Sequence, residues 1–358
     1  NNAKLSDVDK VSDVISAAYV AARLSENEGP LRFNASTSLN KHRYTQDTYA
    51  DQRYFNLAAD ADWAMIRDRF NWMLSDNFSQ RPIISLDSNT PGNVQNTNVF
   101  TFGANIMQPV SRRQNFSITP MYTQYYYETQ LTDNRQYSLA ANWNYQLLRL
   151  TNVGFNLSRR KIDYFEQSIA NTTFTNLALV ISGNRKRSDY SLNMGSTGVK
   201  RDNGQETSGF SGSLDWLLDL SSRSKLQTFL STDLTDTSSV AADQSDPTSG
   251  NDVQVTTDVI RNSVASMTYI RDDEIVNTQF WVRYNKQKYS ESPLDREVRS
   301  AGLNVRHPVT RLLMSNFYLD YGRTKQLQTT RQDKRLTIGG NLKYNFSPKW
   351  SLNIGVRF

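Results

Sequence analysis

The C-terminal stretch "KWSLNIGVRF" (residues 349–358) alternates strictly between apolar and polar side chains. Apolar side chains occupy every second position from Trp350 to Phe358, and Ser, Asn, Gly and Arg fill the positions between them. Successive side chains of a β-strand point to opposite faces, so the stretch predicts a strand with one apolar and one polar face. The surface that the apolar face contacts decides the fold class.

The same two-residue alternation recurs along the whole chain, for example in residues 55–65, 137–147, 276–284 and 336–344. About eighteen such segments follow one another at a spacing of roughly twenty residues, each ending in a cluster of Asn, Asp, Ser, Gly or charged residues. Helical spacing of apolar residues fits almost none of them. No change in composition marks a domain boundary, so residues 1–358 are predicted to form one domain.

The second row of each segment is polar throughout, and only 37% of the chain is apolar. A soluble β-sandwich would pack its apolar rows in a common core and would use shorter strands. Lipid outside and water inside explain both rows, and closure into a barrel pairs the edge strands. The sequence therefore predicts an all-β fold, a transmembrane antiparallel up-and-down β-barrel of about 18 strands (16–20).

Aromatic residues gather towards the ends of the predicted outward rows, as expected for a belt at the membrane interface. The alternative is cross-strand pairing of aromatic residues in a soluble sheet. The predicted belt comprises Tyr137, Tyr145, Tyr190, Tyr284, Tyr289, Tyr321, Tyr344 and Trp350.

Short and long connections alternate, and the longest lie at residues 85–98 and 235–252. By the usual rule for such barrels the short turns face the periplasm, which would place Phe358 at the outer surface. Two interpretations are compatible with this result. Either the sequence lacks a strand at each end, which is the one favoured, or the barrel ends at Phe358 and its long loops face the periplasm.

Several functions lack support in the sequence. The chain has no Cys and only two histidines, His42 and His307, so thiolate metal sites and a Ser-His-Asp triad are not expected. "GFSGS" (209–213) lacks the strand-turn-helix context of a nucleophile elbow. The net charge of +6 comes from basic turns, which lipid head groups or solvation explain without nucleic acid. Neither enzymatic activity nor a cofactor is predicted.

The polar rows supply the candidate functional residues, because side chains that line a pore select its solutes. Basic residues outnumber acidic ones among them, which favours the passage of anions. Aromatic rings in the same rows can stack on sugars. The alternative is that these are ordinary wall residues. The candidates are Arg160, Asp215, Trp281, Arg283, Arg306, Tyr318, Asp320, Lys343 and Arg357.

Two stretches, "NNAKLSDVDKVSD" (1–13) and "RFNWMLSDNFSQ" (69–80), resemble a group of outer-membrane β-barrels encoded with exopolysaccharide and exosortase (PEP-CTERM-type) systems. The resemblance implies an integral outer-membrane protein of a Gram-negative bacterium that exports exopolysaccharide. It also implies a further strand at each end. Alternatives are a general or anion-biased diffusion porin, and a structural sheath for a trans-outer-membrane complex such as a porin-cytochrome conduit. Expected partners are outer-membrane lipid or lipopolysaccharide, polysaccharide, and a periplasmic protein, lipoprotein or cytochrome.

Overall fold

A computed structural model describes residues 13–84, 90–243, 254–273, 275–329, 331–347 and 350–357. The opening stretch at residues 1–12 and Phe358, both used above, lie outside the described residues. In the described part the chain forms eighteen strands, one α-helix and one turn of 3-10 helix, η1 (Pro91–Asn93). No described helix is long and apolar enough to cross a membrane.

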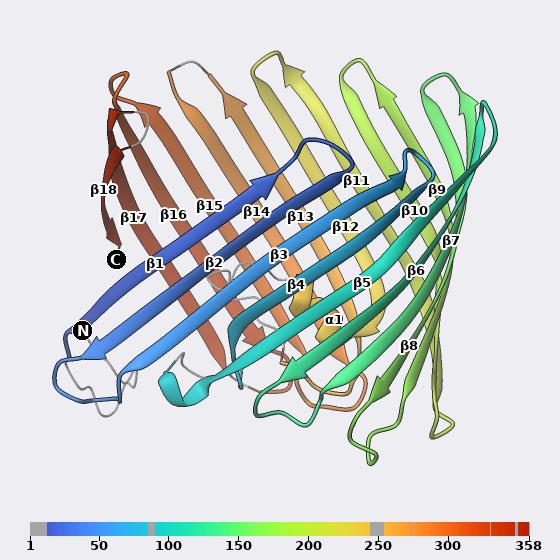
Figure 1. Ribbon diagram of the computed structural model, residues 1–358, viewed down its shortest axis with the longest axis horizontal. Coiled ribbons are helices and arrows are strands. Elements are labelled where there is room, and N and C mark those ends of the chain that lie inside the picture. The colour runs from blue at the N-terminus through green and yellow to red at the C-terminus, as the bar shows by residue number, and fades with distance from the viewer. Residues whose placement is uncertain are drawn as a thin grey trace.

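The strands follow one another along the chain with turns or loops between them (Figure 1). Their bounds are β1 (Ile15–Glu26), β2 (Leu31–Tyr44), β3 (Gln52–Ile66), β4 (Phe70–Pro82), β5 (Val94–Ser111), β6 (Gln114–Tyr127), β7 (Asn134–Leu148), β8 (Thr151–Tyr164), β9 (Thr172–Arg185), β10 (Ser188–Arg201), β11 (Glu206–Ser221), β12 (Ser224–Asp236), β13 (Val259–Asp272), β14 (Asn277–Tyr289), β15 (Arg296–Pro308), β16 (Leu313–Gln326), β17 (Gln332–Ser347) and β18 (Trp350–Arg357). The helix α1 (Thr237–Asp243) follows β12.

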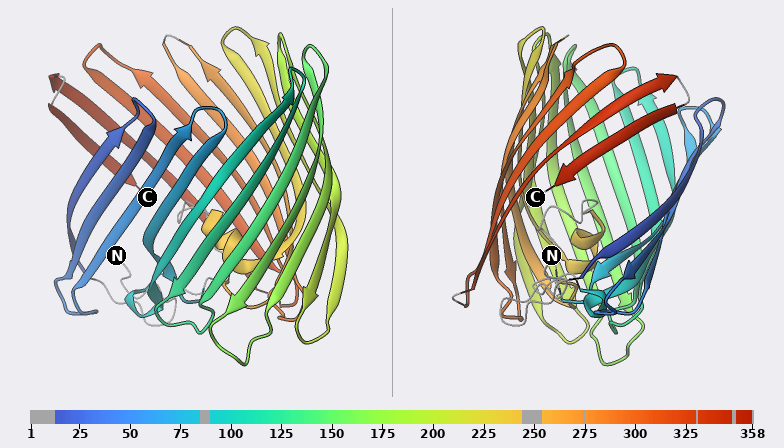
Figure 2. Two further views of the ribbon diagram at one scale, coloured as in Figure 1. Left: turned by 45° about the vertical axis from the view of Figure 1, so that its right-hand side comes forward. Right: turned by 90° about the vertical axis from the view of Figure 1, so that its left-hand side faces the viewer.

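Each strand pairs antiparallel with the next one in the chain, from β1–β2 to β17–β18. The prediction of an up-and-down β-barrel of about eighteen strands is therefore confirmed. Among the described residues β1 and β18 do not pair with each other, so the barrel is open along this seam, and the two strands stand apart in Figure 2. The two-residue turns after β5, β7, β9 and β11 lie at one end of the barrel, the short-turn end, and the longest connections, from β4 to β5 and from β12 to β13, lie at the other, the long-loop end.

The strand registers assign one face of the sheet to the lumen. Arg160 on β8 contacts the lumenal helix α1, and its register partners are Ser138 on β7 and Phe174 on β9. Tyr289 on β14 packs against α1 from the other side. Alternate residues on each strand share this face, which therefore carries the predicted polar rows, while the predicted apolar rows lie outside.

The outward row is apolar only over part of each strand. On β8 it begins with Val153, Phe155 and Leu157 and continues towards the long loops with Arg159 and Lys161. Every strand except β18 has at least 12 residues, more than the roughly 9–11 that span a bilayer. The apolar band therefore lies towards the short turns, and the strands extend beyond it. Outward cations beyond the band include Lys41, Arg43, Arg53, Arg135, Arg159, Lys161, Lys200, Arg261, Lys286, Lys288, Arg299, Arg323, Lys325 and Lys334.

Short polar side chains fasten the loops at the long-loop end. The backbone N–H groups of Tyr127, Tyr164 and Tyr289, each the last residue of its strand, donate to Asp133, Asn171 and Asp295 at 2.7, 3.0 and 2.7 Å. Burial raises the pKa of the Asp133 carboxyl, and the N–H of Tyr127 partly offsets this shift. The repeated contact closes three loops in the same way.

Asp13 holds the loop between β2 and β3. Its carboxylate accepts hydrogen bonds from the backbone N–H groups of Val14, Gln46 and Thr48 at 2.6, 2.9 and 3.3 Å. Burial opposes ionisation of this carboxyl, but the hydrogen bonds outweigh burial and keep its pKa below the usual value. The loop is thereby anchored beside the start of β1.

Candidate functional site

The end of β12 separates from β11 while it stays paired with β13, and it leads into a helix in the lumen. Its pairing with β11 stops at Gly212 and Thr232, and Asp233 instead accepts a hydrogen bond of 3.0 Å from Thr197 Oγ1 on β10. The helix α1 then lies inside the barrel near the long-loop end, as all views show (Figures 1 and 2). We call α1 together with residues 254–258 the lumen segment.

Asp236, the last residue of β12, holds the lumen segment to the β7–β8 wall. Its carboxylate lies 2.9 Å from Nη2 of Arg160 and is only 3% exposed. It also accepts hydrogen bonds from the backbone N–H and the hydroxyl of Ser239 at 2.9 and 2.6 Å, so it caps the first turn of α1. One carboxylate thus starts the helix and binds the helix to the wall.

Arg160 completes this contact from the wall. Its guanidinium donates to the hydroxyls of Thr235 and Ser239, and it lies over the ring of Phe174 at 4.8 Å from the centroid. A planar guanidinium can bind a carboxylate and stack on an aromatic ring at the same time, which a lysine cannot do. We call the Arg160–Asp236 pair the latch.

Other contacts tie the lumen segment to the opposite wall. Arg81 on β4 donates to the carbonyl of Ala241, and Gln254 donates to the carbonyl of Ile83 at 2.9 Å. Val240 and Ala241 pack against Ile260 on β13 and Tyr289 on β14. Contacts with β4, β8, β13 and β14 mean that the segment bridges the lumen, so it narrows the pore at the long-loop end.

Four strands end in a buried tyrosine at the long-loop end of the barrel. Tyr44, Tyr127, Tyr164 and Tyr289 are each the last residue of a strand, and each is at most 9% exposed. The prediction that Tyr289 belongs to an outward interface belt is wrong. Tyr289 has the same parity as the inward Arg283, and its ring packs on α1 rather than facing lipid.

A cavity of about 510 Å³ lies between the latch and the wall formed by β7–β12. Its lining is mostly hydroxyls and amides, which bond to one another. Asn176 donates to Thr197 and Ser211 at 2.9 and 2.8 Å. This chemistry suits neutral, hydrated solutes, because each group can exchange its partner for water or a solute hydroxyl.

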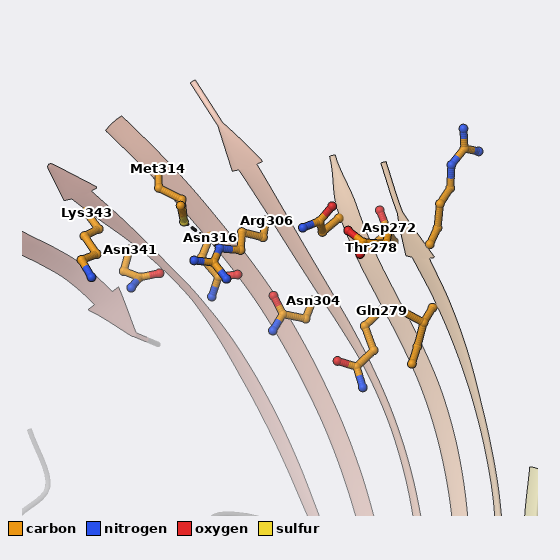
Figure 3. Close-up of a pocket in the computed structure, with 12 residues that line it drawn as sticks. Asp272, Thr278, Gln279, Asn304, Arg306, Met314, Asn316, Asn341 and Lys343 are labelled. Carbon is orange, nitrogen blue, oxygen red and sulfur yellow. Dashed lines mark hydrogen bonds between the residues drawn. The ribbon is translucent and has the colours of Figure 1, made fainter. Parts of the chain in front are cut away.

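A second cavity, of about 470 Å³, lies at the short-turn end of the inner wall of β13–β17 (Figure 3). Arg306 and Lys343 belong to its lining, and Arg306 Nε donates to the sulfur of Met314 at 2.6 Å. Five amide side chains also line this cavity: Asn277, Gln279, Asn304, Asn316 and Asn341.

The structure separates the candidate residues into several places. Arg160 is at the latch, and Arg306 and Lys343 share the second cavity. Trp281, Tyr318 and Asp320 are on the same inward face one or two rows deeper. Arg283 occupies the next inward position after Trp281 on β14. Asp215 lies on β11, opposite Ser191 and Phe229, and shares neither strand nor neighbouring strand with another candidate. Arg357 occurs opposite Gly339, and its side chain lies outside the described residues.

Sequence reasoning missed Asp236, the partner of Arg160. Asp236 falls at the start of a long polar stretch that reads as an ordinary surface loop. The one available signal is "DTSSVAAD" (236–243), in which an Asp precedes a short run of helix-compatible residues. In the described part of the chain no group of His, Asp and Glu is placed to hold a metal ion.

Comparisons with known proteins place the fold among outer-membrane barrels. No family model and no characterised protein matches the sequence. Among solved structures, the chain is similar to the FrpB iron transporter from Neisseria meningitidis (F5-1 variant), with a TM-score of 0.58 and 10% identity over 96% of this chain and 69% of that one.

Two further structures are similar. The copper transporter OprC has a TM-score of 0.56 and 9% identity, over 96% of this chain and 66% of that one. The siderophore receptor PirA from Pseudomonas aeruginosa has a TM-score of 0.51 and 14% identity, also over 96% of this chain and 66% of that one. The chain spans about two thirds of the length of these proteins. At such low identity the similarity shows the fold.

Proposed function

We propose that this chain is a gated transport barrel of the bacterial outer membrane, and that its solute is an exported exopolysaccharide. The observation that carries the proposal is the lumen segment, which is bonded to β4 and β8 on opposite sides of the pore. The apolar outward band supports insertion in a membrane. The solved barrels to which the fold is similar bear the names of transporters and receptors.

The lumen chemistry supports a polysaccharide as the solute. A polysaccharide presents many hydroxyls, and the inner wall offers Ser, Thr, Asn and Gln in both cavities. The resemblance to barrels of exopolysaccharide systems points the same way. A general diffusion porin is the second candidate, favoured by the inward cations, but it would require a pore that stands open.

Planar-bilayer recording tests the gate. The purified chain should conduct little and open only in brief events, because the lumen segment bridges the pore. A porin of this size would show a large and steady conductance from the moment of insertion. Such a steady conductance would contradict the proposed gate.

A deletion strain tests the solute. Without this barrel the exopolysaccharide should accumulate in the periplasm and be lost from the cell surface. Normal surface polysaccharide in that strain would exclude the export role. Co-purification with a multihaem cytochrome or a lipoprotein would favour the sheath function instead.

Ion selectivity gives a further prediction. Arg283 and Arg306 share the inward face without an ion pair among the described residues, so openings should favour anions. Exposed charges are screened over about 8 Å at physiological salt, so the bias should grow as salt falls. Replacing both by Gln should move the reversal potential in a salt gradient towards cations. An unchanged reversal potential would place both arginines outside the ion path.

A further inference from the structure

The cavity at the short-turn end is built in rows across five strands. The registers align Asp272, Asn277, Arg306, Asn316 and Asn341 in one row, and Ile270, Gln279, Asn304, Tyr318 and Gly339 in the next. Lys343 lies opposite Met314 beside the first row. Figure 3 shows Asp272, Gln279, Asn304, Arg306, Asn316, Asn341 and Lys343 spread across the neighbouring strands of this stretch of the sheet. Two cations and five amides therefore share a continuous surface.

The two cations lack a carboxylate partner. Among the described residues neither Arg306 nor Lys343 forms an ion pair, and Asp272 is the one carboxylate lining the cavity. Arg271, at the same edge, pairs with Asp273 at 3.2 Å. Arg160 at the other end of the lumen is neutralised by Asp236. Arg306 and Lys343 are exposed to the lumen and can receive an anion.

Two aromatic rings lie flat on the same face. A Cβ atom on Gly302 would be 2.4 Å from the ring of Trp281, and one on Gly339 would be 2.3 Å from the ring of Tyr318. The rings therefore cover the backbone of the neighbouring strand, and each can present its other face to the lumen. An aromatic face in a wet pore is a surface on which a sugar ring can stack.

We propose that this surface is a binding site for a carboxylated glycan, with Arg306 and Lys343 binding a carboxylate, the amides binding hydroxyls, and Trp281 and Tyr318 supporting the sugar rings. The inference rests on the proposed function and adds the class of polysaccharide, an acidic one. The site is at the end opposite to the lumen segment, so a chain arriving there can bind while the latch is closed.

Calorimetric titration of the full chain in detergent micelles tests the site with oligogalacturonates and with maltooligosaccharides of equal length. Wild type should bind the acidic oligomer more tightly. Removing both cations, with Arg306→Gln and Lys343→Gln together, should weaken that binding about tenfold, because the carboxylate loses both of its charged partners. Trp281→Leu should weaken it about fivefold through lost stacking.

A matched control is the double substitution Lys186→Gln and Arg187→Gln, which removes two exposed cations from the β9–β10 turn at the same end of the barrel. It should leave binding unchanged, and Lys343→Arg should retain it. Equal binding of neutral and acidic oligomers, unchanged binding by the double variant, or equal competition by inorganic phosphate would each overturn the assignment. Because binding is measured without conduction, its failure is distinct from failure of the proposed gate.

Discussion

Substitution of Leu157 by Arg is expected to destabilise the folded barrel by roughly 2–4 kcal/mol, because it places a cation among lipid acyl chains. Leu157 is 50% exposed in the outward row of β8, between Ala141 on β7 and Leu177 on β9. All three positions are apolar, which places Leu157 inside the apolar band. The free energy of unfolding, measured by urea titration in lipid vesicles, gives the size of the effect.

Two neighbouring substitutions serve as controls. Ser158 faces the polar cavity on the inner side of the same strand, so Ser158→Arg should lower the free energy of unfolding far less. Leu139→Arg is outward, but Leu139 lies opposite Arg159 at the border of the band, where a cation costs roughly 0–1 kcal/mol. Equal losses at Leu157 and Ser158 would contradict the assignment of the outer face to lipid.

The strands could be predicted because side-chain alternation is local. Each segment carries its own two-residue pattern, so fold class, strand number and the identity of the two faces follow without knowledge of tertiary contacts. The extent of the apolar band could be read in the same way. On β14 the outward row changes from Phe280 and Val282 to Lys286 and Lys288, which marks where the strand passes beyond the band.

The lumen segment could not be predicted, because it depends on contacts between residues far apart in the chain. Asp236 meets Arg160, and Ala241 meets Arg81, across the width of the barrel. A polar, loop-like composition is equally compatible with solvent and with a water-filled lumen, so the stretch carries no signal of its location. The error on Tyr289 has the same origin, since an amphipathic ring at a strand end suits both an interface and the packing around α1.

Substitution of Asp236 by Ala is expected to open the barrel. The change leaves the guanidinium of Arg160, which is 25% exposed, without its carboxylate, and it removes the cap of α1. Removing one member of a buried ion pair costs about 3–5 kcal/mol, because the other charge stays buried without a partner. The cost falls on the closed arrangement of the lumen segment, since the wall keeps its strand pairing. The fraction of time spent open should therefore rise by about two to three orders of magnitude.

Single-channel recording of matched variants separates the latch from a general effect of charge. Asp163→Ala removes a carboxylate that pairs with Lys161 and Arg135 on the outward face, and it should leave the gate closed. Arg160→Lys keeps the charge but loses the planar contacts to Asp236 and Phe174, so its open fraction should lie between those of wild type and Asp236→Ala. Replacing both latch residues, with Arg160→Met and Asp236→Ala, removes the unpaired charge and should open the pore less than Asp236→Ala alone. If Asp236→Ala stays as closed as wild type while folding normally, the latch does not hold the lumen segment, and the contacts from β4 and β13 must carry the closure instead.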